Sequence, residues 1–497
     1  MAKSEQEHID PTSEISLETV KKRSVSGVLA LTGRTLVLNL ISFAAQGFLW
    51  AFLEPSAFGI FWVVSAVVNF LTYFSDIGLA ASLIQKKEEP SDADLKTTFT
   101  VQQSLVIVSL VILFLVTPVL KNTHSLSPEA VTLLYALGIS FLLSSLKSIP
   151  SVLLERELSF GKLIIPQVFE TLIYNLAVVF FAWKGLGITS FTYAVLIRGV
   201  IGLVLVYIIK PWKPGLSFST ASLKDLLRFG IPYQINTFLA VLKDDGMTII
   251  LGSLLGPTGM GILGTARKLA QYPLRFFMDN VTRVTFPAFS RMQEDKDQIA
   301  RSLTKSIFFI TFLVFPATVG LAVLAPIIVE AIPRYAKWTP ALIPLAIVSV
   351  DTIFASFTTQ LTNLLNAIGK IKTTFKLMII WTFLTFLSVP VLSIRFGVTG
   401  ASIGYALVSI SSIYAVYLAK REVNFSLTES IGRTAFSAAL MGLVLLILRK
   451  FLPADLGGLG LLTLIGGVVY LSCVFLFMGV TLIKDVQKTF VAIFRNG

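Results

Sequence analysis

The sequence predicts an all-α polytopic membrane protein with about fourteen transmembrane helices, and three observations lead to that fold class. Apolar residues make up 55% of the 497 residues, only 14% are charged, and the mean hydropathy is +0.81. Apolar stretches of about 18 or more residues, long enough to cross a bilayer, recur along the chain. One short motif occurs twice, which indicates two six-helix lobes related by a pseudo-two-fold axis along the membrane normal, followed by two C-terminal helices.

The individual spans are placed by the apolar stretches and by the polar, Pro-containing or Gly-containing breaks between them. We expect them near residues 27–52, 57–83, 96–120, 129–149, 162–183, 187–209, 225–254, 258–286, 303–331, 339–366, 373–394, 398–419, 430–451 and 457–482. Because fourteen is an even number, both termini should lie on the same side of the membrane.

The distribution of positive charge indicates which side that is. With the N-terminus in the cytoplasm, 27 of the 41 Lys and Arg residues fall in cytoplasmic segments and loop edges, and 7 fall in the opposite loops. This bias is the one that the positive-inside rule describes. We therefore expect a multi-pass protein with both termini cytoplasmic. The same bias explains the formal net charge of +13 without a nucleic-acid partner.

The repeated motif also sets the predicted domain boundaries. Leu53–Ile60 and Leu255–Ile262 both read L-x-P-[ST]-x-x-G-I, 202 residues apart, and each precedes the second span of a six-span unit. Chance similarity between apolar loops is the alternative, but the equivalent positions favour duplication. The predicted parts are a cytoplasmic tail at 1–24, an N-lobe at 25–212, a linker at 213–221, a C-lobe at 222–421, spans 13 and 14 at 422–483, and a cytoplasmic tail at 484–497. The last two spans form either a side groove for a lipid or an appendage.

Several function classes find no support in the sequence. The single cysteine, Cys473, permits no internal disulfide, and His8 and His124 stand far apart, so we expect no metal site and no cofactor. No Walker motif is present, which argues against a bound nucleotide. The one DxD-like sequence, Ser91–Asp94, lies in a short loop and is interpreted as a solvated turn. A transporter is therefore expected rather than an enzyme.

A cationic stripe in span 8 is the strongest functional signal. Residues 259–286 are long enough to cross a bilayer, yet they contain Arg267, Lys268, Arg275 and Arg283. At about 100° per residue, Lys268, Gln271, Arg275 and Asp279 fall within roughly 80° of one helical face. A cation at the bilayer centre costs at least ~2.5 kcal/mol, so such residues usually face a bundle interior or a watery cavity. This face predicts a path for an anionic substrate.

Two further cations could contribute to that path. Arg34, about seven residues into span 1, either faces the same cavity or reaches the cytoplasmic interface with its long side chain. Arg283 is close to the cytoplasmic end of span 8, where it could form a gate pair with Asp76 or Asp279. An ordinary topology charge is the better interpretation of Arg283.

The embedded carboxylates have two interpretations. They could bind a proton or sodium ion that is coupled to transport, or they could balance the charge of nearby cations. Asp244 and Asp245 adjoin Lys243, which favours charge balancing, whereas Glu170 and Asp351 have no sequence-local partner, which favours ion coupling. The complete set is Asp76, Glu170, Asp244, Asp245, Asp279 and Asp351.

Four segments carry a family resemblance: residues 74–88, FSDIGLAASLIQKKE, residues 155–162, ERELSFGK, residues 283–293, RVTFPAFSRMQ, and Lys337-Trp338. Together they resemble the end of span 2, the loop after span 4, the signature after span 8 and the loop before span 10 of one family. That family is the Wzx-type oligosaccharide-lipid flippases of the polysaccharide transporter family. The likeness extends over roughly residues 22–425. Lys243-Asp244-Asp245 departs from the common pattern, which leaves substrate and ion coupling open.

The resemblance implies a MATE-like fold of the MOP superfamily in a bacterial inner membrane. It implies movement of polyprenyl-diphosphate-linked oligosaccharide from the cytoplasmic to the outer leaflet, for capsule, exopolysaccharide or O-antigen-type polysaccharides. Membrane lipids, and polymerase or chain-length proteins, are the implied partners. A MATE-type exporter of cationic drugs is an alternative, although the basic span 8 argues against it. A lipid II flippase is another, since it would share both the fold and a cationic cavity.

Overall fold

The computed structural model describes residues 37–86, 88–123, 126–157 and 159–478. Every regular element in these ranges is a helix, so the predicted all-α fold class is confirmed. Both predicted tails, Arg34 and the beginning of the first span lie outside the described residues. The side chains of Asp279 and Arg283 lie outside the description as well.

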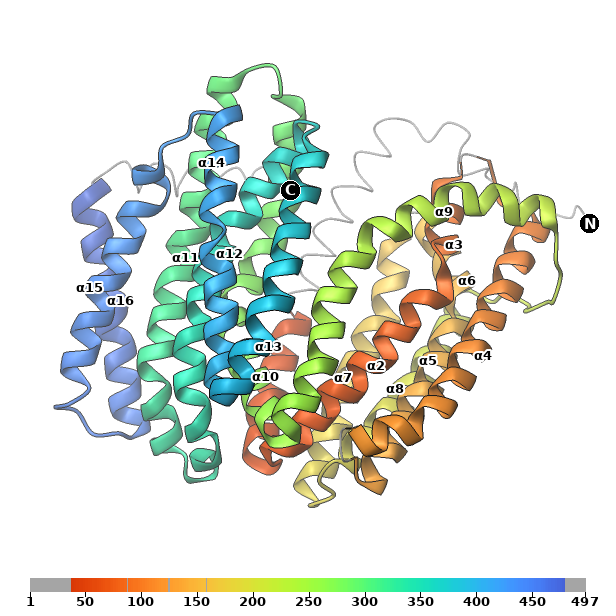
Figure 1. Ribbon diagram of the computed structural model, residues 1–497, viewed down its shortest axis with the longest axis horizontal. Coiled ribbons are helices and arrows are strands. Elements are labelled where there is room, and N and C mark those ends of the chain that lie inside the picture. Colours follow the sequence, from red (N-terminus) through yellow and green to blue (C-terminus); the bar gives the residue numbers. More distant parts are fainter. Residues whose placement is uncertain (1–36, 87, 124–125, 158, 479–497) are drawn as a thin grey trace, which may run out of the picture. The chain divides into compact units, whose positions relative to one another are not determined.

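The helices follow one another with short connections (Figure 1). A first helix at Val37–Phe52 is followed by α2 Pro55–Asp76, α3 Leu79–Gln85, α4 Asp92–Thr123, α5 Pro128–Leu146, α6 Ser148–Arg156, α7 Phe160–Trp183, α8 Thr189–Ile209, α9 Thr220–Val241, η1 Leu242–Gly246, α10 Met247–Arg291, α11 Lys296–Ala331, η2 Pro333–Ala341, α12 Leu342–Ala367, α13 Ile371–Ile410, α14 Ile413–Glu422, η3 Thr428–Gly432, α15 Arg433–Leu448 and α16 Leu456–Met478.

Eleven helical segments of the described chain are long and apolar enough to cross a membrane. Two of them contain a break at a glycine with positive φ: Gly256 at 66° and Gly397 at 57°. A side chain rarely adopts this left-handed conformation, so glycine permits the chain to turn here. Both breaks fall between predicted spans, which supports those boundaries. The count of fourteen stays a prediction.

One predicted span is interrupted at a point that the hydropathy pattern does not reveal. The span expected at 57–83 breaks at Ile77 and Gly78, with φ of 48° and 74°, so that α2 ends at Asp76 and α3 begins at Leu79. The Asp76 carboxylate accepts a hydrogen bond from the Ala80 backbone N–H at 3.1 Å. This bond satisfies a donor that the first turn of α3 would otherwise leave unpaired.

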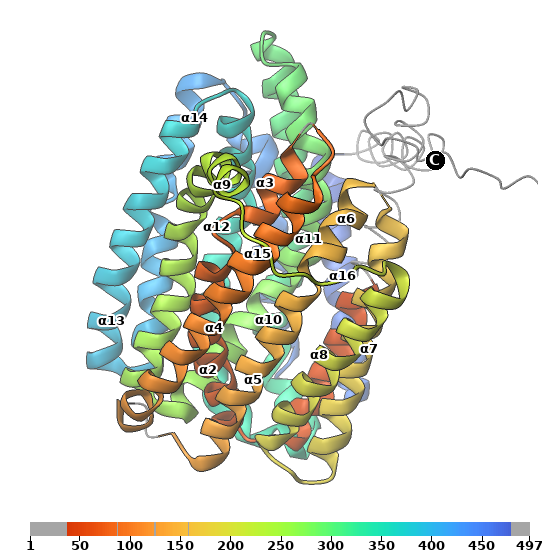
Figure 2. The same ribbon diagram turned by 90° about the vertical axis from the view of Figure 1, so that its right-hand side faces the viewer.

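The chain divides into two compact units, of which unit 1 comprises residues 1–52, 63–246 and 497. Within it, α8 packs against both α5 and α7, as Figure 2 also shows. Helix α9 packs on α3 and α4, and Leu79, Leu83 and Leu226 are buried in the shared core. A close backbone approach between Gly78 and Gly230 brings α9 onto the α2–α3 break, with no room for a Cβ on either residue.

Unit 2 comprises residues 53–62 and 247–496. Helix α12 contacts α10, α11 and α13, and the hairpin of α15 and α16 packs beside α11 (Figure 1). Its largest core joins α11, α12 and α15 through buried residues such as Leu303, Leu361 and Met441. The predicted spans 13 and 14 correspond to α15 and α16.

These compact units do not follow the predicted lobe boundaries. Helix α9 begins at Thr220, in the predicted linker, and continues into the predicted C-lobe, but it packs in unit 1. Residues 53–62, in the predicted N-lobe, pack in unit 2. Helix α9 contacts α3 and α4, which belong to the predicted N-lobe. Residues 53–62 contact α10, which belongs to the predicted C-lobe. The lobes at 25–212 and 222–421 stay a prediction.

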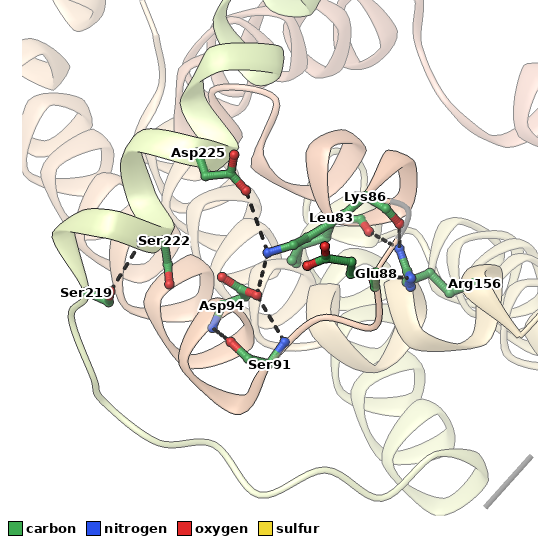
Figure 3. A network of polar contacts seen from close by, with 9 residues as sticks. All are labelled: Leu83, Lys86, Glu88, Ser91, Asp94, Arg156, Ser219, Ser222 and Asp225. Atoms are coloured by element: carbon green, nitrogen blue, oxygen red, sulfur yellow. Dashed lines mark hydrogen bonds and ion pairs between the residues drawn. The ribbon is translucent and has the colours of Figure 1, made fainter. Parts of the chain in front are cut away.

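Three loops meet at one end of unit 1 in the polar network of Figure 3. Lys86, after α3, donates a hydrogen bond to Asp94 of α4 at 2.9 Å and lies 3.6 Å from the Asp225 carboxylate of α9. The hydrogen bond to Asp94 raises the pKa of Lys86. The Arg156 guanidinium, at the end of α6, donates to the backbone carbonyls of Lys86 at 2.7 Å and Glu88 at 2.9 Å. The predicted topology places all of these loops on one side of the membrane.

Candidate functional site

The second part of α10 carries the predicted cationic face. It begins after the break at Gly256, where Pro257 occupies the first helical position, a position that tolerates the missing N–H of proline. One side of this helix packs into unit 2, because Ala266 and Ala270 are buried against Leu345 and Val348 of α12. Small alanine side chains permit a close approach between the two helices. The orientation of the cationic face follows from this packing.

Lys268, Gln271 and Arg275 lie on a different side of α10. Their positions fall within about 60° of one another at 100° per residue. Lys268 and Arg275 are exposed and Gln271 is half-buried. The three residues extend over about 10 Å of helix, at 1.5 Å per residue. The structure therefore brings these predicted site residues together on an accessible face.

Arg267 has different surroundings from its neighbour Lys268. Its guanidinium carbon lies 3.8 Å from the ring centroid of Tyr405 on α13, and the residue is half-buried. A guanidinium over an aromatic face makes a favourable cation–π contact. Sequence reasoning missed Tyr405, because nothing in the chain signals which aromatic ring of α13 faces α10.

The other two cations of the predicted site, Arg34 and Arg283, have side chains that the structure does not describe. Arg34 lies outside the described residues, and the side chain of Arg283 is not described. The same is true of the Asp279 side chain. The proposed gate pair of Arg283 with Asp76 or Asp279 thus stays a prediction.

Glu170 of α7 forms a buried charge cluster in unit 1. Only 6% of the residue is exposed. Lys147, which follows α5, donates a hydrogen bond to one carboxylate oxygen, and the Arg198 Nε of α8 lies 3.6 Å from the other. The Arg198 guanidinium also lies 5.7 Å from the ring centroid of Tyr174. These partners come from segments 23 and 28 residues away in the chain, and they favour charge balancing over ion coupling at Glu170.

Lys147, like Tyr405, contacts a predicted site residue but could not be identified from the sequence. The predicted span at 129–149 ends two residues after Lys147, so this residue counts among the cations at cytoplasmic loop edges. In the structure α6 continues from Ser148 to Arg156, so Lys147 lies about 13 Å before the end of this helical segment, at 1.5 Å per residue. Its side chain is 18% exposed.

Asp76 is also held by neighbouring polar groups. Besides the Ala80 N–H, the Gln102 side-chain amide of α4 donates to Asp76, and the Ser148 hydroxyl donates to Gln102 at 2.7 Å. These bonds connect the α2–α3 break to α4 and α6. Asp76 therefore has a clear structural role in unit 1.

The three other carboxylates are spread over both units. Asp244 and Asp245 lie in the π-helical turn η1 of unit 1, where Asp244 is 3.7 Å from the Lys243 ammonium and Asn69 of α2 hydrogen-bonds to Asp245. Asp351 is half-buried in α12 of unit 2. Among the described residues, no group of three or more His, Cys, Asp or Glu could hold a metal ion.

A separate apolar cavity lies between α11, α15 and α16 in unit 2. Its volume is about 410 Å³, and its lining includes Pro316 and Gly320 of α11, Met441 of α15, and Thr463 and Gly466 of α16. All three helices are candidate membrane spans.

Comparison with known proteins gives a consistent result. The profile of a family described as "Polysaccharide biosynthesis protein" matches residues 49–343. The chain is 25% identical over 401 residues to the lipopolysaccharide biosynthesis protein WzxC of Escherichia coli K12, covering 80% of this chain and 81% of that protein.

Two solved structures show the same fold. The inward closed conformation of the lipid II flippase MurJ matches with a TM-score of 0.76 and 16% identity, over 92% of this chain and 99% of that one. An inward-facing multidrug resistance MATE family transporter of the MOP superfamily matches with a TM-score of 0.62 and 16% identity, over 78% of this chain and 95% of that one. The predicted MATE-like fold class is confirmed.

Proposed function

We propose, from the premise that this chain belongs to the polysaccharide biosynthesis protein family, that it is a flippase for lipid-linked oligosaccharides. Its substrate would be a polyprenyl-diphosphate-linked glycan repeat unit, moved from the cytoplasmic to the outer leaflet by alternating access. It acts as a transporter and not as an enzyme. Its product would supply capsule, exopolysaccharide or O-antigen-type polysaccharide, and polymerase or chain-length proteins would be its partners.

The observation that carries this proposal is the accessible cationic face of α10. A diphosphate cannot enter hydrocarbon without a large desolvation cost, so its passage needs compensating charge within the membrane. Lys268 and Arg275 supply exposed cations on one face of a candidate span. Arg can donate two parallel hydrogen bonds to phosphate oxygens, while Lys acts as a point charge.

The lipid tail makes different demands from the head group. It needs only apolar surroundings, and the cavity between α11, α15 and α16 offers them within the membrane-spanning part of unit 2. We propose that this side cavity accepts part of a long lipid chain while the cationic face holds the diphosphate. In this proposal α15 and α16 help to hold the lipid chain and are more than an appendage.

Two sources of energy could drive the proposed transport cycle. An interior-negative potential favours outward movement of anions by roughly 2.3 kcal/mol per charge per 100 mV. A coupled proton or sodium ion is the other, and the pairing of Glu170 with two cations argues against Glu170 as its binding site. Transport that stayed constant from about pH 5.5 to 8.5 and without sodium would exclude coupling to either ion.

Two other substrates would fit this fold. A lipid II flippase shares it, but the family match favours a polysaccharide precursor. A MATE-type exporter of cationic drugs also shares it, but exposed Lys268 and Arg275 would repel a cationic drug.

The proposal is tested by flipping of a fluorescent polyprenyl-diphosphate oligosaccharide in proteoliposomes. Arg275→Ala should lower the rate about tenfold or more, because a hydrogen bond to a charged group contributes ~1.5–3 kcal/mol. Arg275→Lys should retain part of the activity. The matched control is Arg395→Ala, which removes an exposed arginine from α13 and should leave the rate unchanged. A wild-type protein that exported a cationic dye and moved no such lipid would overturn the proposal.

A further inference from the structure

Helices α13 and α14 form an antiparallel hairpin that turns at the break at Gly397 (Figure 1). Near the turn, a Cβ atom on Gly404 would lie 2.7 Å from the Val389 Cα, so the two arms are in close contact. At the other end, the ammonium of Lys370, just before α13, lies 3.1 Å from the carboxylate of Glu422, the last residue of α14. The start of α13 and the end of α14 therefore share one end of the hairpin, which the predicted topology places on the cytoplasmic side.

This end of the hairpin carries an excess of positive charge. Its cations are Lys370, Lys372, Lys376, Lys420 and Arg421. Glu422 is the only acidic residue that the sequence contains between Asp351 and Glu429. Its ion pair with Lys370 leaves four exposed cations, and none of these four is paired with a carboxylate in the described part of the chain. Cations this close together repel one another, so the site favours a bound anion.

Aromatic rings border the cations. Tyr414 and Tyr417 of α14 stack with ring centroids 6.2 Å apart, and they are 49% and 56% exposed. The Arg421 guanidinium lies 6.0 Å from the Tyr417 ring centroid, and the Lys420 ammonium lies 5.9 Å from that of Phe425. Exposed tyrosines are enriched where a membrane span leaves the hydrocarbon, because the ring is apolar and the hydroxyl is polar. These rings therefore indicate that the cations lie at the level of the lipid head groups.

An exposed apolar face continues from the cations along α13. Ile371, Phe375 and Ile379 are each more than 40% exposed, and they fall within about 80° of one another at 100° per residue. They belong to a segment that is long and apolar enough to cross a membrane. An acidic protein segment would satisfy the cations and leave this face uncovered. A phospholipid satisfies both, because its head group carries the negative charge and its acyl chains cover the apolar face.

We propose that the cytoplasmic end of the α13–α14 hairpin binds the head group of an anionic phospholipid. The phosphate oxygens would accept hydrogen bonds from the lysine ammonium groups and from the Arg421 guanidinium. Basic clusters at the cytoplasmic ends of membrane helices recognise anionic head groups in this way. The site is separate from the cationic face of α10 and does not depend on the transported substrate.

The first test measures lipid binding in the absence of any transport substrate. In a Cys473→Ala background, Asn424→Cys provides a single thiol in the exposed loop after α14, and this thiol carries a bimane fluorophore. The protein is reconstituted in phosphatidylcholine vesicles that contain increasing fractions of a lipid spin-labelled near its head group. Spin-labelled phosphatidylglycerol should reach half-maximal quenching at a mole fraction about tenfold lower than spin-labelled phosphatidylcholine, because only the former carries a net negative charge.

Charge variants locate this preference on the hairpin. The triple variant Lys372→Gln, Lys376→Gln and Lys420→Gln should reduce the preference for phosphatidylglycerol to about twofold or less. The matched control removes three exposed lysines from other predicted cytoplasmic segments and should keep the preference; it is Lys213→Gln, Lys224→Gln and Lys296→Gln. Equal quenching by the two lipids in the unsubstituted protein, or equal preferences in the two triple variants, would overturn the site.

A further variant should change binding in the opposite direction. Glu422→Gln removes the only carboxylate of the cluster and frees Lys370, so it should strengthen phosphatidylglycerol binding about threefold and leave phosphatidylcholine unchanged. Loss of a folded site cannot produce tighter binding, so this outcome supports a direct contact, whereas unchanged or weaker binding contradicts it. A hairpin that bound a polyprenyl diphosphate and ignored phosphatidylglycerol would overturn the proposal. Intact phosphatidylglycerol binding by a protein that flips no lipid-linked oligosaccharide would overturn the proposed function alone.

Discussion

The charge cluster of Glu170, Lys147 and Arg198 permits a quantitative prediction about which of its two ion pairs stabilises unit 1. Glu170 lies ten residues after the start of α7, or about 15 Å along the helix, which is half of a hydrocarbon core about 30 Å thick. The side chains of Glu170 and Lys147 are 8% and 18% exposed, while that of Arg198 is 49% exposed. The two cations therefore differ in how deeply the protein buries them.

The two ion pairs should therefore differ in how much each contributes to the free energy of unfolding. Removing one partner of a buried pair leaves an uncompensated charge and costs ~3–5 kcal/mol. Lys147→Met should therefore destabilise the protein by about 3 kcal/mol or more. Exposed pairs contribute ~0.2–1 kcal/mol, so Arg198→Gln should cost about 1 kcal/mol or less. Combining Lys147→Met with Glu170→Gln should cost less than the sum of the two single variants, because no unpaired buried charge remains.

The assay is unfolding in mixed detergent micelles with increasing SDS, followed by tryptophan fluorescence. Arg395→Gln, which removes an exposed arginine, is the matched control and should change the free energy of unfolding little. Equal decreases in the free energy of unfolding for Lys147→Met and Arg198→Gln would refute the reasoning. A decrease in the double variant equal to the sum of the two single-variant decreases would refute it as well. The same double variant also distinguishes the two roles of Glu170: charge balancing predicts an unchanged pH dependence of transport, and ion coupling predicts its loss.

Two other predictions concern unit 1. Burial raises the pKa of Glu155 on α6 above its ordinary value of 4.5, so the folded protein loses stability as the pH rises through that raised pKa. Glu155→Gln should raise the melting temperature at pH 7, and the gain should disappear below about pH 4 in a thermal melt series. Gly202→Ala would place a Cβ against the Glu170 carboxylate, and should lower the melting temperature by several degrees, whereas Gly467→Ala should not. Equal melting temperatures for the two alanine variants would contradict this packing.

The sequence predicted those features that depend on one segment alone. Hydropathy is a local property, so the all-α membrane fold and the breaks near Gly256 and Gly397 could be read from the chain. The angular spacing of Lys268, Gln271 and Arg275 depends only on the helix period, and the structure places all three on one accessible face. Whether that face binds the substrate stays a prediction.

Features that depend on contacts between helices could not be read in the same way. Glu170 lacks a cation within one helical turn, yet Lys147 and Arg198 lie beside it, 23 and 28 residues away in the chain. Which helices are neighbours is decided by packing of the whole unit, not by the periodicity of either helix. The absence of a sequence-local partner is therefore weak evidence for an ion-coupling carboxylate. The same holds for Asp351, which the same reasoning identified.

The repeated motif shows how structure can strengthen a sequence interpretation. Two similar loops can arise by chance, and similarity alone gives no reason for them to touch. In a two-fold symmetric interface, residue i of one copy contacts residue j of the other, and residue j contacts residue i in return. Gly59 meets Pro257 and Gly261 meets Pro55, and both pairs obey this rule at the offset of 202 residues. This reciprocity is what duplication predicts when the motif lies close to a local two-fold axis, and the duplication itself stays a prediction.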